Sequence, residues 1–319
     1  FTENSRKLTM RFALVFPGQG SQSLGMMAAY GDSSVVRGTF DEASRALGRD
    51  LWQLVTEGPA EALNQTVNTQ PLMLTAGIAV FRLWQEMGGK APSMVAGHSL
   101  GEYSALVAAG VLRFRDAVPL VELRAEAMQE AVPSGEGAMA AILGLDAVAV
   151  KAAYADSAQG QVVEAVNFNT PEQIVIAGHA AAVQRAAVAA KAKGAKRAVM
   201  LPVSAPFHCS LMKPAAERLR QRLADLSFSV PLMPVVNNSD VSCLDDPQQI
   251  KEALVRQAAS PVRWVETMQA MAGQGVTHVY ECGPGKVLAG LVKRCADGMI
   301  GGAMADLAGL EAALAVANA

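Results

Sequence analysis

The sequence predicts an α/β protein whose main sheet is mostly parallel and covered by helices on both faces. Of its 319 residues, 51% are hydrophobic, enough to bury the core of one large domain or of two unequal ones. Segments with the pattern of buried strands alternate with helical segments along the first and last parts of the chain. That alternation is typical of a parallel sheet with helices on either side.

The first part of the chain supplies two strands and the helices around them. In order, the predicted elements are a strand at 11–16, helical stretches to about residue 87 that include Pro71–Met87, a strand at 94–96, and helices at 102–109 and 116–130. The strand at 11–16 leads into a glycine-rich loop, Pro17–Gln22. Ligands of parallel sheets bind at the carboxyl ends of the strands, so we expect the active site there, in a crevice under the smaller domain described below.

The last part of the chain repeats the alternation. The predicted elements are a strand at 233–236, helices near 248–272, a strand at 276–281 and a helix at 286–296. The end of the chain after residue 298 is rich in glycine and alanine, and we expect it to be loosely held.

The middle of the chain has a different pattern and predicts a second, smaller domain. Its elements are a strand at 138–143, a helix at 146–158, strands at 162–168 and 173–178, a helix at 180–193 and a strand at 197–203. The order β-α-β-β-α-β is ferredoxin-like. We therefore expect a ferredoxin-like domain at 135–204, inserted in a catalytic α/β domain formed by 10–134 and 205–319. Residues 1–9 precede Met10 and are interpreted as a remnant outside the fold.

The run Gly97-His98-Ser99-Leu100-Gly101 has the G-x-S-x-G pattern of a nucleophile elbow. A predicted strand precedes it and a predicted helix follows, which is the context that this motif requires. The glycines leave room for the sharp turn, and Ser99 is expected at its tip near the positive end of the helix. The motif indicates acyl transfer to serine in a large domain that is α/β-hydrolase-like. A serine that merely caps a helix is the structural alternative.

A serine nucleophile needs a base, and the chain has four histidines. His98 is next to Ser99 at a sharp turn, so its side chain is expected to point away. His179 begins a predicted helix and His278 lies in a predicted strand, where structural roles are expected. His208 lies in a proline-containing loop, Ala205–Cys209, and is the predicted base. No aspartate stands out as a third member, so a backbone carbonyl could orient the imidazole.

Arg124 falls in the middle of the apolar face of the predicted helix 116–130. A guanidinium cannot lose its proton, so a buried one needs an anionic partner. One reading is a structural ion pair inside the protein. The other is a fork for a substrate carboxylate, which would select an acyl group with a free acid.

Several motifs in a fixed order carry a family resemblance over nearly the whole chain from Met10. They are Phe16–Gln22, Thr69–Pro71, Gly97–Tyr103, Arg124, Val166–Asn169, Phe207-His208, Val236–Asn238 and Gly283–Gly285. With these motifs the chain resembles the malonyl-CoA:acyl carrier protein transacylases of bacterial type II fatty acid synthesis. It is similar also to the acyltransferase domains of fatty acid and polyketide synthases.

The resemblance implies a role for each matching residue. Ser99 is the expected nucleophile, His208 the base, and Arg124 the anchor of the malonyl carboxylate. Backbone amides of Gln19 and Leu100 are expected to form the oxyanion hole. The carbonyl of Gln257 is expected to orient the base in place of an aspartate. Phe207 is the residue type that related synthase domains carry when they choose malonyl over methylmalonyl.

The resemblance also implies the reaction and its partners. A malonyl group passes from malonyl-CoA to the phosphopantetheine thiol of acyl carrier protein through a malonyl-serine, in ping-pong order. No cofactor is expected, since coenzyme A enters as part of the substrate. The formal net charge of −2 gives no electrostatic case for nucleic acid or a membrane surface. The four cysteines are scattered and no metal motif occurs, so we expect a cytoplasmic, metal-free monomer.

Two other functions remain open from the residues. An α/β-hydrolase-type thioesterase or esterase shares the elbow, but such enzymes usually carry an acidic third member and have no need of a buried arginine. A non-catalytic module that binds a carrier protein is disfavoured, because Ser99, His208 and Arg124 are all present.

Overall fold

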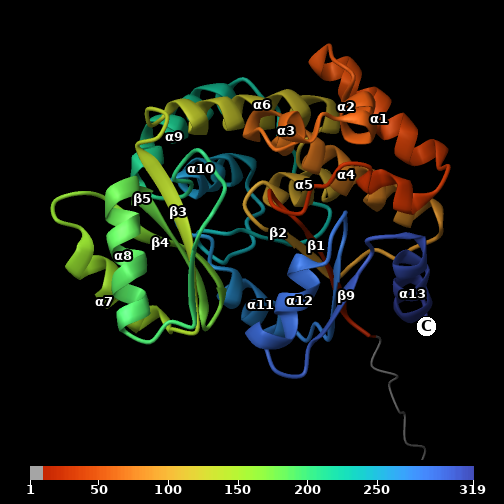
Figure 1. Cartoon of the computed structure of the whole chain (residues 1–319). Coiled ribbons are helices and arrows are strands. Elements are labelled where there is room, and N and C mark those ends of the chain that lie inside the picture. Colours follow the sequence, from red (N-terminus) through yellow and green to blue (C-terminus); the bar gives the residue numbers. More distant parts are fainter. Residues whose placement is uncertain (1–9) are drawn as a thin grey trace, which may run out of the picture.

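The computed structural model describes residues 10–319, which form two β-sheets with helices packed around them (Figure 1). The interpretation of residues 1–9 lies outside the described part. The larger sheet has five parallel strands in the order β7-β2-β1-β8-β9. Their bounds are β1 Phe12–Phe16, β2 Met94–Gly97, β7 Val235–Val236, β8 His278–Glu281 and β9 Ile300–Ala303.

Alternate side chains of β1 point to opposite faces of this sheet, and both faces are buried. Phe12, Leu14 and Phe16 belong to one core cluster, whereas Ala13 and Val15 belong to another. The first cluster includes side chains of helices from the first, middle and last parts of the chain, and the second those of the helices at 264–273 and 287–295. A mostly parallel sheet with both faces covered is therefore confirmed.

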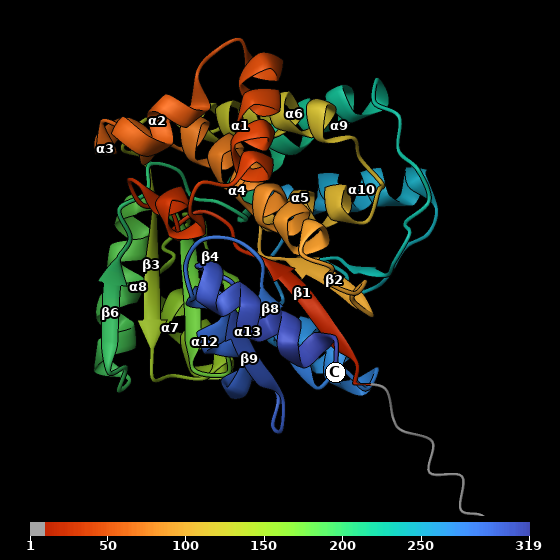
Figure 2. The same cartoon turned by 90° about the vertical axis from the view of Figure 1, so that its right-hand side faces the viewer.

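The helices around the larger sheet come from both ends of the chain (Figure 2). Their bounds are α1 Ser34–Leu47, α2 Leu51–Glu57, α3 Ala60–Leu63, α4 Thr66–Glu86, α5 Gly101–Ala108, α6 Phe114–Glu130, α9 Lys213–Ala224, α10 Pro247–Ala258, α11 Trp264–Gly273, α12 Val287–Cys295 and α13 Leu307–Ala317. Short 3-10 helices lie at Met26–Tyr30 and Ser210–Met212. Within residues 10–319, no helix combines the length and the apolar character that a membrane crossing needs.

The smaller sheet is antiparallel and has the strand order β4-β5-β3-β6. Its elements are β3 Gly137–Leu143, α7 Ala147–Ser157, β4 Val163–Thr170, β5 Gln173–His179, α8 Ala180–Ala192 and β6 Arg197–Met200. Both helices pack on one face and form a core cluster of their own with the sheet. β6 ends three residues earlier than predicted, just before the segment that contains Pro202.

Helix α4 begins at Thr66, five residues before the predicted start at Pro71. A proline inside a helix has no N–H to donate to the carbonyl four residues earlier, which here is that of Val67. The guanidinium of Arg49 donates to that carbonyl instead, at 3.4 Å. A partner from the loop between α1 and α2 thus satisfies the carbonyl that Pro71 leaves free.

The end of the chain is ordered, so the expectation of a loosely held tail after 298 is wrong. β9 extends the parallel sheet, and α13 packs its apolar side, including Leu310, against the core. The Asp306 side chain accepts from the Gly309 N–H and caps α13, and the buried Tyr30 hydroxyl donates to the Met304 carbonyl at 2.8 Å. Helix α9 was not predicted either, although Leu219 and Leu223 repeat at helical spacing and are buried.

Candidate active site

Ser99 lies at the turn between β2 and α5, with a left-handed φ of 53°. A Cβ on Gly97 would lie 1.9 Å from the backbone of Gly101, and a Cβ on Gly101 would lie 2.0 Å from the carbonyl oxygen of Phe16. Only glycine fits at either position, which explains the two glycines of the motif. The strand, the strained serine and the helix form the predicted nucleophile elbow.

Asn238, which follows β7, binds the backbone of the elbow through its side chain. Its Oδ1 accepts from the Ser99 N–H at 2.8 Å, and its Nδ2 donates to the Gly97 carbonyl at 2.7 Å. The side chain is fully buried, and it satisfies two backbone groups that the sharp turn leaves without partners. The sequence analysis assigned Asn238 no role, although it lies in one of the motifs that carried the resemblance.

Replacement of Asn238 by leucine should lower the rate of Ser99 acylation at least about tenfold and the free energy of unfolding by about 2 kcal/mol. Both effects follow from leaving buried backbone groups of the elbow unpaired. Asn237→Leu is the matched control, because Asn237 bonds only within its own turn, to Ser242 and Asp240. Urea unfolding and single-turnover acylation would measure the two effects. Equal acylation rates in both variants would show that Asn238 does not shape the elbow.

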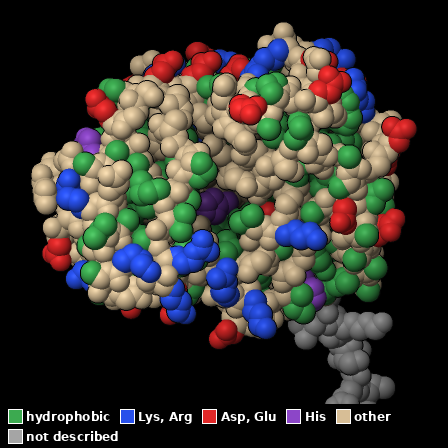
Figure 3. Space-filling model, viewed as in Figure 1, with side chains coloured by type: hydrophobic (Ala, Val, Ile, Leu, Met, Phe, Trp, Pro, Cys, Tyr) green, Lys and Arg blue, Asp and Glu red, His purple; other side chains and the backbone are tan. Residues whose placement is uncertain are grey.

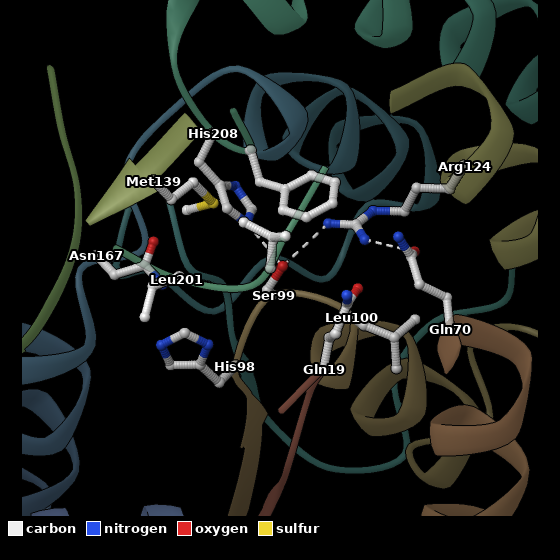
Figure 4. A pocket seen from close by; sticks show the side chains of 12 residues that line it. Gln19, Gln70, His98, Ser99, Leu100, Arg124, Met139, Asn167, Leu201 and His208 are labelled. Carbon is white, nitrogen blue, oxygen red and sulfur yellow. Dashed lines mark hydrogen bonds between the residues drawn. The ribbon is translucent and has the colours of Figure 1, made fainter. Parts of the chain in front are cut away.

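His208 lies beside Ser99, in the loop between β6 and the 3-10 helix at Ser210–Met212 (Figure 4). Its Nε2 is 2.6 Å from Ser99 Oγ, and its Nδ1 is 2.9 Å from the carbonyl oxygen of Gln257 at the end of α10. The carbonyl accepts the Nδ1 proton, which leaves Nε2 free to take the proton of the hydroxyl. No acidic side chain takes part in this contact.

The side chains of the other three histidines contact groups other than the Ser99 hydroxyl. His98 Nε2 is 2.8 Å from Asn169 Oδ1, and its ring lies against that of Trp264. His179 Nδ1 accepts from the Val162 N–H, and His278 Nδ1 is 2.9 Å from the Thr277 hydroxyl.

Burial holds His208 in the neutral form that a base needs. Burial, together with the nearby positive charge of Arg124, lowers the pKa of the imidazole to about 3. The unfolded chain binds a proton at this position below about pH 6.5, and the folded chain does not until about pH 3. The free energy of unfolding that His208 contributes is therefore lost progressively as the pH falls from 6.5.

We expect this difference in proton binding to lower the free energy of unfolding by about 2 kcal/mol between pH 7.5 and pH 5. Urea unfolding at the two pH values, compared between the natural chain and His208→Gln, would isolate it, because other titrating groups are common to both. The variant should lose less stability on acidification. The same pH dependence in both proteins would contradict a neutral, buried imidazole.

Arg124 on α6 is 1% exposed and points at the nucleophile. Nη1 donates to Gln70 Oε1 at 2.6 Å, and Nη2 donates to Gln257 Oε1 at 3.0 Å and to Ser99 Oγ at 3.2 Å. The guanidinium carbon lies over the Tyr103 ring, 5.3 Å from the ring centroid. The Arg124 Nε has no hydrogen-bond partner among the described residues.

No ion pair to Arg124 occurs among the described residues, so the alternative of a structural ion pair is wrong. Its hydrogen-bond partners there are neutral oxygens, so none of the described carboxylates contacts the guanidinium directly. The site therefore suits an anion that arrives with the substrate.

These side chains surround a hollow of about 110 Å³ between the two sheets, which opens on one face of the molecule (Figure 3). Gln19, Leu100 and Phe207 line it together with Ser99, His208 and Arg124. A Cβ on Gly18 would lie 2.6 Å from the carbonyl oxygen of His98, so the loop that carries Gln19 touches the elbow directly.

The two amides predicted for the oxyanion hole lie at this junction of loop and elbow. Within residues 10–319, neither the Gln19 N–H nor the Leu100 N–H donates to a protein acceptor. The Gln19 side chain is itself fixed, since its Oε1 accepts from the Thr66 hydroxyl at 2.7 Å. The arrangement leaves two backbone donors free next to Ser99, as acyl transfer requires. We find no group of acidic, histidine or cysteine side chains there, or elsewhere in the described chain, that could hold a metal ion.

Comparison with known proteins agrees with this chemistry. The family model of the acyl transferase domain matches residues 13–312. Malonyl CoA-acyl carrier protein transacylase of Escherichia coli K12 is 58% identical over 305 residues, which cover 95% of this chain and 99% of the relative. The Bacillus subtilis transacylase is 49% identical over 286 residues, 89% of this chain and 90% of the relative. The chain belongs to the malonyl CoA-acyl carrier protein transacylase family.

Solved structures of the transacylase family have the same fold. The acyl-carrier-protein S-malonyltransferase of Burkholderia pseudomallei 1710b superposes with a TM-score of 0.94 at 60% identity, and 96% of this chain and 100% of that chain are covered. A malonyl-transacylase solved in complex with its holo type II PKS acyl carrier protein has a TM-score of 0.94 at 55% identity, with 96% and 99% covered. The predicted family and the predicted class of enzyme, an acyltransferase, are thereby confirmed.

The transacylase site contains one residue, besides Asn238, whose contribution the sequence did not reveal. Gln70 lies on α4, directly before Pro71, and its Oε1 accepts from Arg124. Its own Nε2 donates to the Thr66 hydroxyl at 3.3 Å, which fixes the carboxamide so that the oxygen faces the guanidinium. The signal was present in the Thr69–Pro71 motif, but a motif does not say which side chain meets which.

Proposed function

We propose that this chain transfers the malonyl group from malonyl-CoA to the phosphopantetheine thiol of acyl carrier protein, in fatty acid biosynthesis. The observation that carries the proposal is a buried arginine without an ion pair, 3.2 Å from a serine that is 2.6 Å from a histidine. Serine and histidine supply acyl transfer, and the guanidinium supplies a place for one carboxylate. A malonyl thioester has the carboxylate and the reactive carbonyl that such a site needs.

In the first half-reaction Ser99 Oγ attacks the thioester carbonyl and His208 Nε2 takes the hydroxyl proton. The Gln19 and Leu100 amides hold the negative charge that develops on the carbonyl oxygen. The loss of one such donor typically costs about 3–4 kcal/mol of transition-state stabilisation. The carbon–sulfur bond then breaks, coenzyme A leaves as a thiol with the proton from His208, and malonyl-Ser99 remains.

In the second half-reaction the thiol of the carrier protein gives its proton to His208 and attacks the ester carbonyl of malonyl-Ser99. The ester bond breaks, Ser99 regains its proton from His208, and the malonyl thioester leaves on the carrier protein. Because one product leaves before the second substrate binds, the order is ping-pong. Every group in this cycle belongs to the chain or to the substrates, so the proposal requires no cofactor.

Two further features belong to the proposal. Residues 10–134 and 205–319 form the catalytic domain, with 135–204 as a ferredoxin-like domain that lines the other side of the hollow through Met139 and Asn167. Phe207 lines the hollow and is proposed to favour malonyl over methylmalonyl groups. The reaction is placed in the cytoplasm, in keeping with four cysteines that are all unpaired, and the chain is proposed to act as a monomer.

The test separates transfer from hydrolysis, the activity of a thioesterase. Malonyl-CoA is supplied with and without holo acyl carrier protein, and free coenzyme A, free malonate and malonyl carrier protein are quantified. We expect malonyl carrier protein to form in step with coenzyme A, with parallel double-reciprocal plots and little malonate. Sustained release of malonate at the same rate in the absence of carrier protein would contradict the proposal. No turnover at all would favour a non-catalytic module.

A further inference from the structure

A second charged side chain is buried next to this site. Glu102 lies in the first turn of α5, three residues after Ser99, and is 2% exposed. Its Oε2 accepts from the Asn238 N–H at 3.0 Å and from Gln257 Nε2 at 3.0 Å. The proposed cycle does not use this carboxylate, and burial of an unused charge is costly. Its position therefore calls for an explanation.

Gln257 connects Glu102 to Arg124 through its carboxamide. Its Nε2 donates to Glu102 Oε2 at 3.0 Å and to the Ser99 carbonyl at 2.8 Å, and its Oε1 accepts from Arg124 Nη2 at 3.0 Å. A carboxylate offers only acceptors and a guanidinium only donors, so the amide dipole is aligned between a negative and a positive charge. The two charges are held one carboxamide apart, without direct contact.

This spacing has a consequence for substrate binding. A direct ion pair would take up one or two of the guanidinium's N–H donors and so compete with a substrate carboxylate for them. At one carboxamide's distance the negative charge still lowers the cost of burying Arg124, yet Glu102 takes none of its N–H donors, and the end that faces Ser99 meets only the neutral oxygens of Ser99 and Gln257. The same charge repels any second anion that binds at Arg124, since the interior screens charges less than water does.

We propose that Glu102 is a resident countercharge of Arg124, which stabilises the empty site and weakens its preference for anionic acyl groups. The inference rests on the proposed malonyl transfer and adds a residue that sets how strongly malonyl is selected. Glu102 does not contact Ser99 Oγ or His208, so it acts as a positioning residue, through its charge on Arg124 and through its hydrogen bonds to Gln257 and Asn238. A malonyl group held less tightly is more readily passed on to the second thiol.

Glu102→Gln tests the proposal, because glutamine keeps the shape and an acceptor oxygen for Gln257 but removes the charge. The quantity measured is the ratio of kcat/KM for malonyl-CoA to that for acetyl-CoA at pH 8, where the carboxyl is ionised. We expect the ratio to rise about fivefold or more, chiefly through a lower KM for malonyl-CoA. A ratio that stays the same or falls would overturn the proposal, including the case in which both substrates lose equally.

The matched control is Glu281→Gln. Glu281 is the other buried glutamate within residues 10–319, with no exposed surface, and its Oε2 accepts from the Ala289 N–H near the start of α12. It makes no contact with Arg124, Gln257 or Ser99. The same chemical change there should leave the malonyl to acetyl ratio as it is. An equal rise in both variants would overturn the assignment of the effect to Glu102.

A second measurement needs no variant. Burial raises the pKa of Glu102 to about 7, against the opposite effects of its two hydrogen bonds and of Arg124. Protonation removes the negative charge of Glu102, so the ratio of kcat/KM for malonyl-CoA to that for acetyl-CoA should rise in the natural chain as the pH falls from 8 to 6. A ratio that does not change with pH would overturn the proposal.

The other charged or titratable groups around Glu102 are Arg124, Tyr103 and Asp240. Arg124 stays protonated, the pKa of Tyr103 is raised to about 12, and Asp240 is held in an ion pair with Arg256 at 2.5 Å. Changes in His208 affect both substrates and cancel in the ratio. If Arg124→Ala abolishes the malonyl preference while Glu102→Gln and pH leave it unchanged, the proposed function stands and this inference fails.

Discussion

Ser99→Ala is expected to lower malonyl transfer to acyl carrier protein by about 10⁴-fold or more. The elbow places one hydroxyl in reach of His208 and of the two free amides, and no neighbouring side chain can replace it there. His208→Ala should have an effect of similar size. The double variant should be hardly worse than either single one, because nucleophile and base act as a unit. Initial rates of malonyl carrier protein formation would measure all three.

Ser104→Ala is the matched control for Ser99→Ala. Ser104 lies on α5, the helix that follows Ser99, is fully buried, and its Oγ has no hydrogen-bond partner within the described residues. Its loss should leave the transfer rate within a few-fold of that of the natural chain. Retention of more than about a tenth of the activity by Ser99→Ala would show that another group carries the acyl chain.

Arg124→Ala is expected to invert the acyl preference. In the natural chain an acetyl group leaves the buried guanidinium without a carboxylate, whereas a malonyl group supplies one. In the variant the malonyl carboxylate is the charge left without a partner, at a cost of a few kcal/mol, or roughly 10²-fold or more in kcat/KM. The kcat/KM for acetyl-CoA should stay the same or rise. Measurement of kcat/KM for malonyl-CoA and acetyl-CoA would show the crossover.

Two further variants sharpen this result. Arg124→Lys should recover only part of the malonyl preference, because an ammonium group cannot make two parallel hydrogen bonds to a carboxylate. Arg82→Ala removes an arginine that is paired with Glu42 on the protein surface, and should leave the preference unchanged. Equal losses for malonyl-CoA and acetyl-CoA in Arg124→Ala would show that the arginine is structural.

The elbow, the buried arginine and both sheets could be predicted because each depends on local pattern. A strand, a glycine and a helix follow one another around Ser99. Helical spacing alone places Arg124 on the apolar face of its helix. Elements that depend on distant partners could not be predicted. Helix α4 passes through Pro71 because Arg49 satisfies the carbonyl of Val67, and that contact joins residues eighteen apart.

The same distinction explains the supporting polar residues. Asn238 and Ser99 are 139 residues apart in the sequence, and Gln257 and Ser99 are 158 apart. Only the packing of β7 beside β2, and of the end of α10 behind the elbow, brings them together. A single sequence has no pattern that pairs such side chains, although the resemblance had already drawn attention to the Gln257 carbonyl.

The central claim is that Ser99 carries the malonyl group. Intact-mass measurement after brief incubation with malonyl-CoA, followed by peptide mapping, tests it most directly. We predict a gain of one malonyl group, located on the peptide that contains Ser99, and much less modification with acetyl-CoA at the same concentration. No mass gain, or a malonyl group located on another residue such as Cys209, would contradict the account.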